Sequence, residues 1–347
     1  MIKNYILGVL LFTVSLSVKA QNQEALFEKS LLTLNDMLVN ESHYSFKKAV
    51  FSVENAYLNG KLDSLAVNGQ IKVLKELCSL LINGRFLAYV ESDKPDVNKW
   101  ASVYQVMCDS IPIIIKDQEY RYIPFRYDFD DVFGNQELSN MFISKLLTTR
   151  KGNCHSLPYL YKILCEELGT TANLALAPNH IYIKHQNKKN GWYNTELTSG
   201  IFPNDAWLMA SGFIHVDAIK NGVYMKALNN KESIALVMMD LADAYQKTFP
   251  NNDGSFLLNC SQTALSVFPN LTSALIMRAE IHKKQIEKET NIDKAKQDFK
   301  KLEVEYSHIH KLGYRYMPEE MYLNWLVSLK TEREKYENKK LTNFNKK

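Results

Sequence analysis

The sequence has few cysteines, little proline and no large excess of charge of either sign. Its 347 residues include 5 cysteines, 9 prolines, 42 basic residues and 38 acidic residues. No Cys-x-x-Cys pair occurs, which argues against a structural zinc site or a dithiol redox site. The composition therefore excludes a disulfide-dense scaffold, and the near balance of charge provides no basic surface for nucleic acid.

Long apolar runs are also lacking, with one exception at the N-terminus. Lys3 precedes an apolar stretch from Tyr5 to Val18, and Val18-Lys19-Ala20 offers a small-residue cleavage site. The stretch is short for a membrane span, and no cysteine follows it for a lipid anchor. We expect residues 1–20 to be a signal peptide and the protein to be exported, periplasmic or secreted, without stable membrane insertion after cleavage. An uncleaved anchor is the alternative.

Apolar periodicity divides the rest of the chain. Helical spacing dominates residues 21–110 and 223–330, whereas β-branched and aromatic runs occur in residues 111–222. We therefore expect an α+β protein that is mostly helical, with one small antiparallel sheet confined to about residues 110–200. Residues 331–347 are expected to be a solvated basic tail.

The middle region contains the elements of a compact site. A helix is expected from Glu137 to Leu147, and the Gly152-Asn153 break separates it from a second helix at about Cys154 to Leu168. Asn190-Gly191 predicts a hairpin turn between two antiparallel strands. The strand-like segments after the second helix are Ala172 to Ala177, Ile181 to His185 and Gly191 to Leu197.

The C-terminal region contains weak helix-hairpin repeats. One unit includes residues 241–245 and 264–269, and the next runs from residues 274–281 to residues 295–302. Small residues flanked by large apolar ones, with a proline closing the second helix, are similar to the tetratricopeptide pattern. A plain helical bundle fits the same pattern, so both alternatives stay open.

A cysteine, a histidine and an acid follow one another in the middle region. Cys154 stands where a helix begins, His180 opens a strand, and Glu196 ends the strand expected to be its antiparallel neighbour. A helix N-terminus and a nearby imidazolium both favour a thiolate, and a carboxylate orients the imidazole. The pattern predicts a Cys-His-Glu triad for nucleophilic catalysis, without a metal or cofactor.

Residues beside the triad are further candidates. Gly152 would let the backbone approach a substrate, and the side chains of Asn153 and Asn179 are candidates for an oxyanion hole. Asp205 is the alternative to Glu196 as the third member. We expect Cys154 to be partly exposed with a depressed pKa. The cysteines expected to be buried and structural are Cys78, Cys108, Cys165 and Cys260.

Three motifs resemble the transglutaminase-like superfamily, whose members share a papain-like core. They are Arg150-Lys151-Gly152-Asn153-Cys154-His155-Ser156-Leu157-Pro158, Leu168-Gly169 and Ala177-Pro178-Asn179-His180. The resemblance directly covers residues 127–200, and it implies a helix packed on an antiparallel sheet, followed by tetratricopeptide-type helices. It also implies acyl transfer to or from a peptide or protein, either as hydrolysis or as transamidation. Cys154 would be the nucleophile and His180 the base, and Glu196 departs from the usual Asp.

Two other classes of function stay open. A non-catalytic module would bind an extended peptide or protein partner in the cleft or on the helical repeats, and would leave Cys154 no more reactive than the other cysteines. A metal site would use Cys154, His155, His180 and His185. Strand alternation opposes the metal site, because it places His185 on the face opposite His180.

Overall fold

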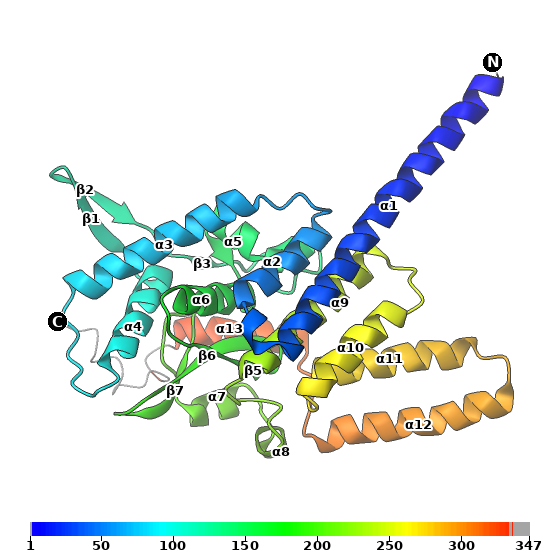
Figure 1. Cartoon of the computed structure of the whole chain (residues 1–347). Coiled ribbons are helices and arrows are strands. Elements are labelled where there is room, and N and C mark those ends of the chain that lie inside the picture. The colour runs from blue at the N-terminus through cyan, green and yellow to red at the C-terminus, as the bar shows by residue number, and fades with distance from the viewer. Residues whose placement is uncertain (1, 333–334, 336–347) are drawn as a thin grey trace.

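The computed structural model describes residues 2–332 and residue 335, and the side chains of residues 1–20 are not among those described. The described chain is mostly helical, and its strands lie between Ile111 and Thr195 (Figure 1). This confirms the α+β class with a high helical content. Most of the expected basic tail, at residues 333–334 and 336–347, lies outside the described residues.

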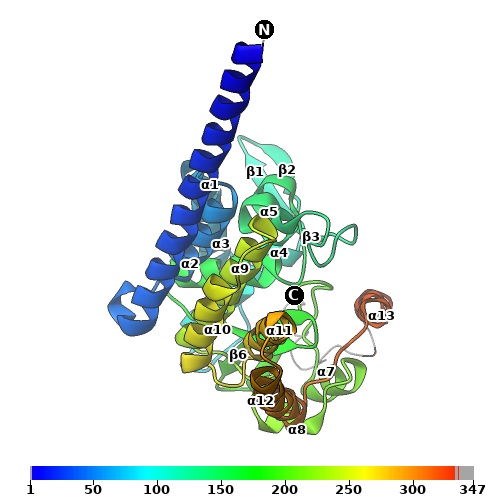
Figure 2. The same ribbon diagram turned by 90° about the vertical axis from the view of Figure 1, so that its right-hand side faces the viewer.

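The N-terminal region consists of helices. Serine and aspartate begin two of them, since Ser45 accepts a hydrogen bond from the Lys48 N–H and Asp63 accepts one from the Ala66 N–H. The first helix extends far beyond the rest of the chain (Figures 1 and 2), and the expected signal peptide would make up its first half. Among the described residues, no helix combines the length and apolarity of a membrane span. The helices are α1 (Ile2–Val39), α2 (Phe46–Tyr57), α3 (Ser64–Gly84) and α4 (Lys94–Cys108), with the short 3₁₀ helix η1 (Glu41–His43) after α1.

Three small sheets occur where one was expected. Strands β1 and β2 form an antiparallel hairpin. Its turn residues are Lys116 and Asp117, whose φ angles of 49° and 62° suit a tight turn. Strands β3 and β4 form a parallel pair, and β5, β6 and β7 form an antiparallel sheet in that order. The strands are β1 (Ile111–Ile115), β2 (Gln118–Tyr122), β3 (Arg126–Tyr127), β4 (Lys151–Gly152), β5 (Asn173–Ala177), β6 (His180–Asn187) and β7 (Gly191–Thr195). The predicted antiparallel hairpin of β6 and β7 is confirmed.

The helix expected from Glu137 to Leu147 is divided in two, namely the 3₁₀ helix η2 (Leu138–Met141) and helix α5 (Ile143–Thr149). The cause is Glu54 of α2, whose carboxylate accepts hydrogen bonds from the N–H groups of Ile143 at 2.6 Å and Ser144 at 3.1 Å. A distant side chain thus caps α5, and the local pattern could not predict that start.

Helix α6 (Ser156–Glu167) is buried along most of its length and packs on β5 and β6 from one side and on α4 from another. The C-terminal helices α9 to α12 each pack against the next, and Asn229 and Glu232 form a reciprocal cap at the start of α9. The last helix, α13, packs against the face of the β5–β7 sheet that carries His180. The helices after the sheet are α7 (Asp205–Ser211), α8 (Val216–Lys220), α9 (Asn230–Thr248), α10 (Ser255–Val267), α11 (Thr272–Lys288), α12 (Ile292–Lys311) and α13 (Glu319–Thr331).

Candidate active site

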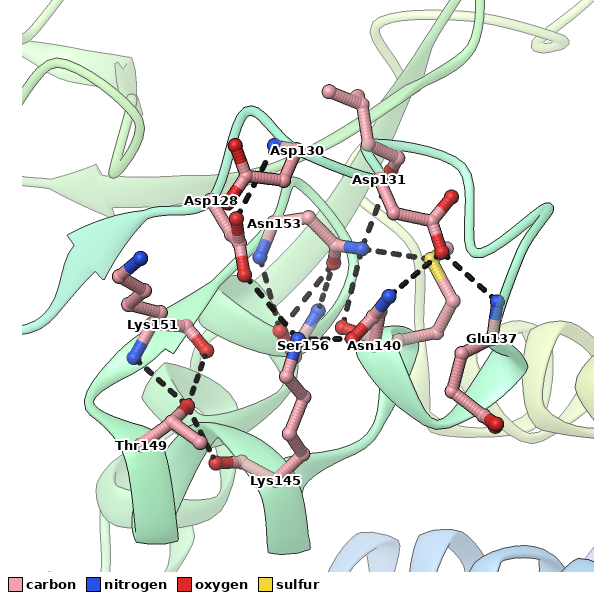
Figure 3. Close-up of polar contacts among 12 residues, drawn as sticks. Asp128, Asp130, Asp131, Glu137, Asn140, Lys145, Thr149, Lys151, Asn153 and Ser156 are labelled. Carbon is pink, nitrogen blue, oxygen red and sulfur yellow. Dashed lines mark hydrogen bonds and ion pairs between the residues drawn. The ribbon is translucent and has the colours of Figure 1, made fainter.

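Cys154 lies in the turn that leads into α6, two residues before the helix begins. The side-chain oxygen of Asn153 accepts a hydrogen bond from the Ser156 N–H at 3.1 Å, and the Ser156 hydroxyl accepts one from the Asn153 N–H (Figure 3). The same oxygen of Asn153 accepts from the His155 N–H at 3.0 Å, and the Leu157 N–H donates to the Asn153 carbonyl. These bonds fix the turn that holds Cys154 near the N-terminal end of α6, where the helix dipole favours an anionic sulfur.

A loop rich in aspartates supports this turn. The Asp131 carboxylate accepts hydrogen bonds from the Glu137 N–H at 3.0 Å and the Asn140 side chain at 2.6 Å (Figure 3). It also accepts one from the Asn135 N–H at 2.8 Å. Asn153 in turn donates to the carbonyl oxygen of Asn140. Among the described residues, no three His, Cys, Asp or Glu side chains are placed to hold a metal ion. The carboxylate of Asp131 therefore organises the loop that holds the start of α6.

His180 and Glu196 meet at one end of the β6–β7 hairpin. Ile183 pairs with Thr195, so the register extended by one residue places Glu196 beside Tyr182, on the same sheet face as His180. The Nε2–H of His180 donates to Glu196 Oε2 at 2.5 Å, and the other carboxylate oxygen accepts from the Thr198 N–H at 2.7 Å. This carboxylate therefore fixes both the tautomer and the orientation of the ring.

The other side of His180 faces the sulfur of Cys154. The hydroxyl of Tyr322 on α13 lies 3.1 Å from His180 Nδ1 and 3.0 Å from Cys154 Sγ. Cys154 is 5% exposed, His180 3% and Glu196 1%, so the expectation of a partly exposed cysteine is wrong. The reason is α13, because Tyr322 and Trp325 pack against the His180 ring.

The charged forms of Cys154, His180 and Glu196 stabilise one another. Burial raises the pKa of Cys154, but hydrogen bonding with His180, the charge of His180 and the Tyr322 hydroxyl outweigh it, so the pKa is lowered. Burial lowers the pKa of His180, yet Glu196 and Cys154 raise it to about 10. Burial also opposes ionisation of Glu196, but the charge of His180 lowers the pKa of that carboxyl. A thiolate, an imidazolium and a carboxylate are therefore the favoured forms.

The flanking candidates have other contacts. The side chain of Asn153 holds the turn before α6 and also donates to Val132 O at 3.2 Å, and that of Asn179 donates to Met317 O at 3.0 Å. Both amides thus have partners within the protein, and their part in an oxyanion hole stays a prediction. A Cβ on Gly152 would lie 2.5 Å from Ser156 Oγ and 2.7 Å from Leu146 Cδ1, so close packing against α5 and α6 requires glycine at this position.

The alternative third member, Asp205, does not reach His180. Its carboxylate accepts hydrogen bonds from Lys184 at 3.3 Å and Asn194 at 2.8 Å, at the exposed start of α7. The structure brings Glu196, and not Asp205, to the imidazole ring.

The four residues of the alternative metal site do not converge on one point, since among them only His180 faces the sulfur of Cys154 with its ring hydrogen-bonding groups. His185 stacks on Trp100 with ring centroids 4.4 Å apart, and its Nε2 lies 3.0 Å from the Tyr161 hydroxyl. Burial lowers the pKa of His185 to about 3. His155 instead contacts Met141 O at 3.0 Å and Asp240 at 2.9 Å. The rings of these two histidines thus make their hydrogen bonds with groups other than Cys154.

A cleft of about 530 Å³ opens beside the triad. Cys154 and His180 lie on one side of it, and helices α9 and α11 form the opposite side. His155 connects the two sides, since its Nε2–H donates to Asp240 of α9 and the Tyr159 hydroxyl donates to the same carboxylate. The C-terminal helices and the triad therefore enclose one shared space.

Three residues near the thiol were not predicted from the sequence. Tyr322 belongs to an apolar stripe at helical spacing that predicts a buried helix but not what the helix covers. Asp240 lies on a distant helix. The Tyr127 hydroxyl is buried beside Cys154 and Tyr322, and burial and the charge of Cys154 raise its pKa. Only its place in the strand paired with Gly152 puts Tyr127 beside the sulfur.

The chain matches no family model, and no curated protein matches it. Among solved structures, a crystal structure of menin, described as revealing the binding site for Mixed Lineage Leukemia (MLL) protein, is similar with a TM-score of 0.40 and 12% identity. The match covers 87% of this chain and 74% of that chain. The geometry of the site is therefore the basis for a function.

Proposed function

We propose that this chain is an exported transglutaminase-like protein that performs cysteine-dependent acyl transfer or amide hydrolysis through Cys154, His180 and Glu196. The observation that supports the proposal is the convergence of these three side chains, with complementary charge, at the edge of a cleft. We also propose that α6 and the β5–β7 sheet correspond to a papain-like core, and that α9 to α12 are tetratricopeptide-type helices.

In the first step, the thiolate of Cys154 attacks a carbonyl carbon of an amide in the cleft. The N–H of Cys154 lies in the turn before α6, beside the Tyr127 hydroxyl, and this pair of groups is our candidate donor to the developing oxyanion. The imidazolium of His180 gives a proton to the departing amine. Glu196 stabilises the positive charge of the imidazolium before this transfer. The product is a thioester on Cys154.

In the second step, His180 is neutral and acts as a base toward the incoming nucleophile. Water yields hydrolysis and a primary amine yields transamidation, and the thiolate of Cys154 leaves as the thioester breaks. Both outcomes use the same residues, so the choice depends on which nucleophile the cleft admits.

A second candidate function is peptide or protein binding without catalysis. The observation that favours it is the composition of the cleft, because α9 and α11 supply most of the wall opposite Cys154. In the enzyme these helices would hold the substrate, and in a binding module they would hold a partner. Both functions place an extended peptide in the same cleft.

The experiment that tests the proposal measures ammonia release and incorporation of a labelled primary amine on a broad panel of peptide amides. We expect the wild-type protein to release or exchange the amide group and Cys154→Ala to be inactive. Equal turnover by both proteins would overturn the enzyme. Binding of a peptide by both proteins without turnover would favour the binding module.

Export is tested separately. We expect the mature protein recovered from its producing cells to begin close to Gln21, as determined by mass spectrometry, because the first twenty residues have the order of a cleaved signal. An intact segment from Met1 to Ala20 would refute this part of the proposal.

A further inference from the structure

One hydroxyl group touches both the nucleophile and the base of the candidate site. Tyr322 comes from α13, 168 residues after Cys154, and its oxygen lies 3.0 Å from Cys154 Sγ and 3.1 Å from His180 Nδ1. The residue is 0% exposed. Its ring is fixed by Phe133, with centroids 5.1 Å apart, and by Trp325 at 5.8 Å. A side chain held this firmly keeps its hydroxyl at hydrogen-bond distance from both groups.

The position of Tyr322 leaves the cleft open. Cys154 and His180 both line the cleft, whereas Tyr322 lies outside its lining, on the side of the sulfur that faces α13. A substrate can therefore enter between α9 and the triad without displacing the hydroxyl. This arrangement fits a working part of the site better than an obstruction.

We propose that Tyr322 is a further catalytic residue, which relays the proton of the Cys154 thiol to His180 and then stabilises the thiolate. This inference rests on the proposed function of the triad. The structure has the Tyr322 O–H donating to Cys154 Sγ, as the favoured thiolate form requires, and His180 Nε2–H donating to Glu196. The relay begins from the neutral form of the site, in which the S–H of Cys154 donates to the Tyr322 oxygen and the Tyr322 O–H donates to His180 Nδ1.

Transfer shifts two protons along this chain. The S–H bond of Cys154 breaks and its proton forms a new O–H bond on Tyr322, while the original O–H bond breaks and its proton forms an N–H bond on His180 Nδ1. Tyr322 stays neutral, Cys154 becomes a thiolate and His180 becomes an imidazolium. Afterwards the two hydrogen bonds of the Tyr322 oxygen are reversed in direction, the bond from His180 to Glu196 is unchanged and none is lost, so the hydroxyl donates to the thiolate.

Other titratable groups also face the sulfur, and a test must hold them constant. They are His180 from β6, with Glu196 behind it, Tyr127 from β3 and His155, the N-cap of α6, with Asp240 of α9 behind it. Removing only the oxygen of Tyr322 leaves all of these groups in place.

The test compares Tyr322→Phe with Tyr182→Phe in the full-length mature protein. Tyr182 is a matched control, because it is 1% exposed, its ring stacks on His180, and its hydroxyl forms no hydrogen bond with the described residues. The measurements are the pH dependence of Cys154 alkylation by iodoacetamide and the thiolate absorbance near 240 nm, each corrected with Cys154→Ala. Neither measurement needs a substrate, so a lack of turnover would refute the proposed function without deciding this inference.

We expect Tyr322→Phe to raise the apparent pKa of Cys154 by about one unit or more and to slow alkylation at pH 7 by about tenfold, because a hydrogen bond to a charged group is lost. Tyr182→Phe should match the wild type. An unchanged pKa would overturn the proposal, and faster alkylation of Tyr322→Phe at an unchanged pKa would make Tyr322 an obstruction instead. If Tyr322→Phe does not fold, Trp325→Phe, which loosens the packing of α13 but keeps the hydroxyl, should shift the pKa in the same direction by less, and no shift would overturn the proposal.

Discussion

Two cysteines associated with one helix differ sharply in their chemistry. Cys154 lies in the turn before α6 and Cys165 in the last turn of that helix, and both are buried, at 5% and 0% exposure. Burial raises the pKa of each thiol, but the pKa of Cys165 is raised well above its usual value while that of Cys154 is lowered. The difference comes from His180 and Tyr322, which contact only Cys154. The comparison teaches that the partners of a buried thiol, and not its burial, decide its ionisation.

The largest expected effect is a difference in turnover between variants of the two cysteines. Cys154→Ala should abolish acyl transfer and change the thermal midpoint by less than about 2 °C, whereas Cys165→Ala should keep turnover and lose about 1 kcal/mol of stability. Turnover and thermal unfolding measured on the same two variants check this. Full turnover in Cys154→Ala would remove the distinction between the thiols.

The next prediction concerns the imidazole on which the difference depends. Glu196→Gln should slow turnover by roughly 10²-fold, because the amide neither carries the charge that stabilises imidazolium nor fixes the tautomer. His180→Ala should lose all measurable turnover, since the base itself is gone. The readout is kcat on the amide substrate, with Asp205→Asn as the control carboxylate.

Activity in Glu196→Gln equal to that of Asp205→Asn would show that the carboxylate has no part in the reaction. Asp205 suits this comparison because it is on the same side of the hairpin but bonds to Lys184 and Asn194 instead of the histidine.

The parts of this site that depend on neighbouring residues could be predicted from the sequence. Asn153 before an amphipathic helix indicates a helix start, and a hairpin of known register brings His180 to Glu196. The side-chain oxygen of the same asparagine accepts hydrogen bonds from the N–H groups of His155 and Ser156, so its place before the helix predicts a structural role as well.

The parts that depend on distant residues could not be predicted. Glu54 divides the η2–α5 segment from 89 residues away, and Tyr322 reaches Cys154 from 168 residues away. Periodicity specifies which face of a helix is buried but not which element covers it. The covering helix α13 is also the reason that the site is more buried than its sequence indicated.

The contrast between the cysteines can be sharpened without a substrate. At pH 7, Cys154 should react with iodoacetamide at least about tenfold faster than Cys165, because an ordinary thiol is only a few per cent ionised at this pH and Cys165 less still. Mass spectrometry of tryptic peptides after brief labelling gives both rates. Cys260, whose pKa burial also raises, is an internal control and should label as slowly as Cys165.

Comparable labelling of Cys154 and Cys165 would mean that His180 does not hold the sulfur of Cys154 as a thiolate. Loss of the difference only after unfolding in denaturant would support the role of the folded site.

The smallest expected effect concerns the hydrogen bond between His155, which follows Cys154, and Asp240 of α9 on the other side of the cleft. Burial lowers the pKa of His155, but the charge of Asp240 and its hydrogen bond raise it from 6.5 to about 9. The folded state therefore binds this proton more tightly than the unfolded state. The stabilisation is fully present below pH 6.5 and is lost as pH rises through about 9.

Asp240→Asn should accordingly destabilise the protein by on the order of 3 kcal/mol at pH 6 and by much less at pH 10. Chemical unfolding at both pH values measures the difference. Asp298→Asn is the control, because its ion pair with Lys301 is solvent-exposed and contributes less than about 1 kcal/mol. A penalty for Asp240→Asn that is the same at pH 6 and pH 10 would mean that His155 is uncharged in the folded protein. In that case α9 would be held beside Cys154 by packing and by the hydrogen bond from Tyr159 to Asp240 alone. A charge on His155 would then make no contribution to the low pKa of Cys154.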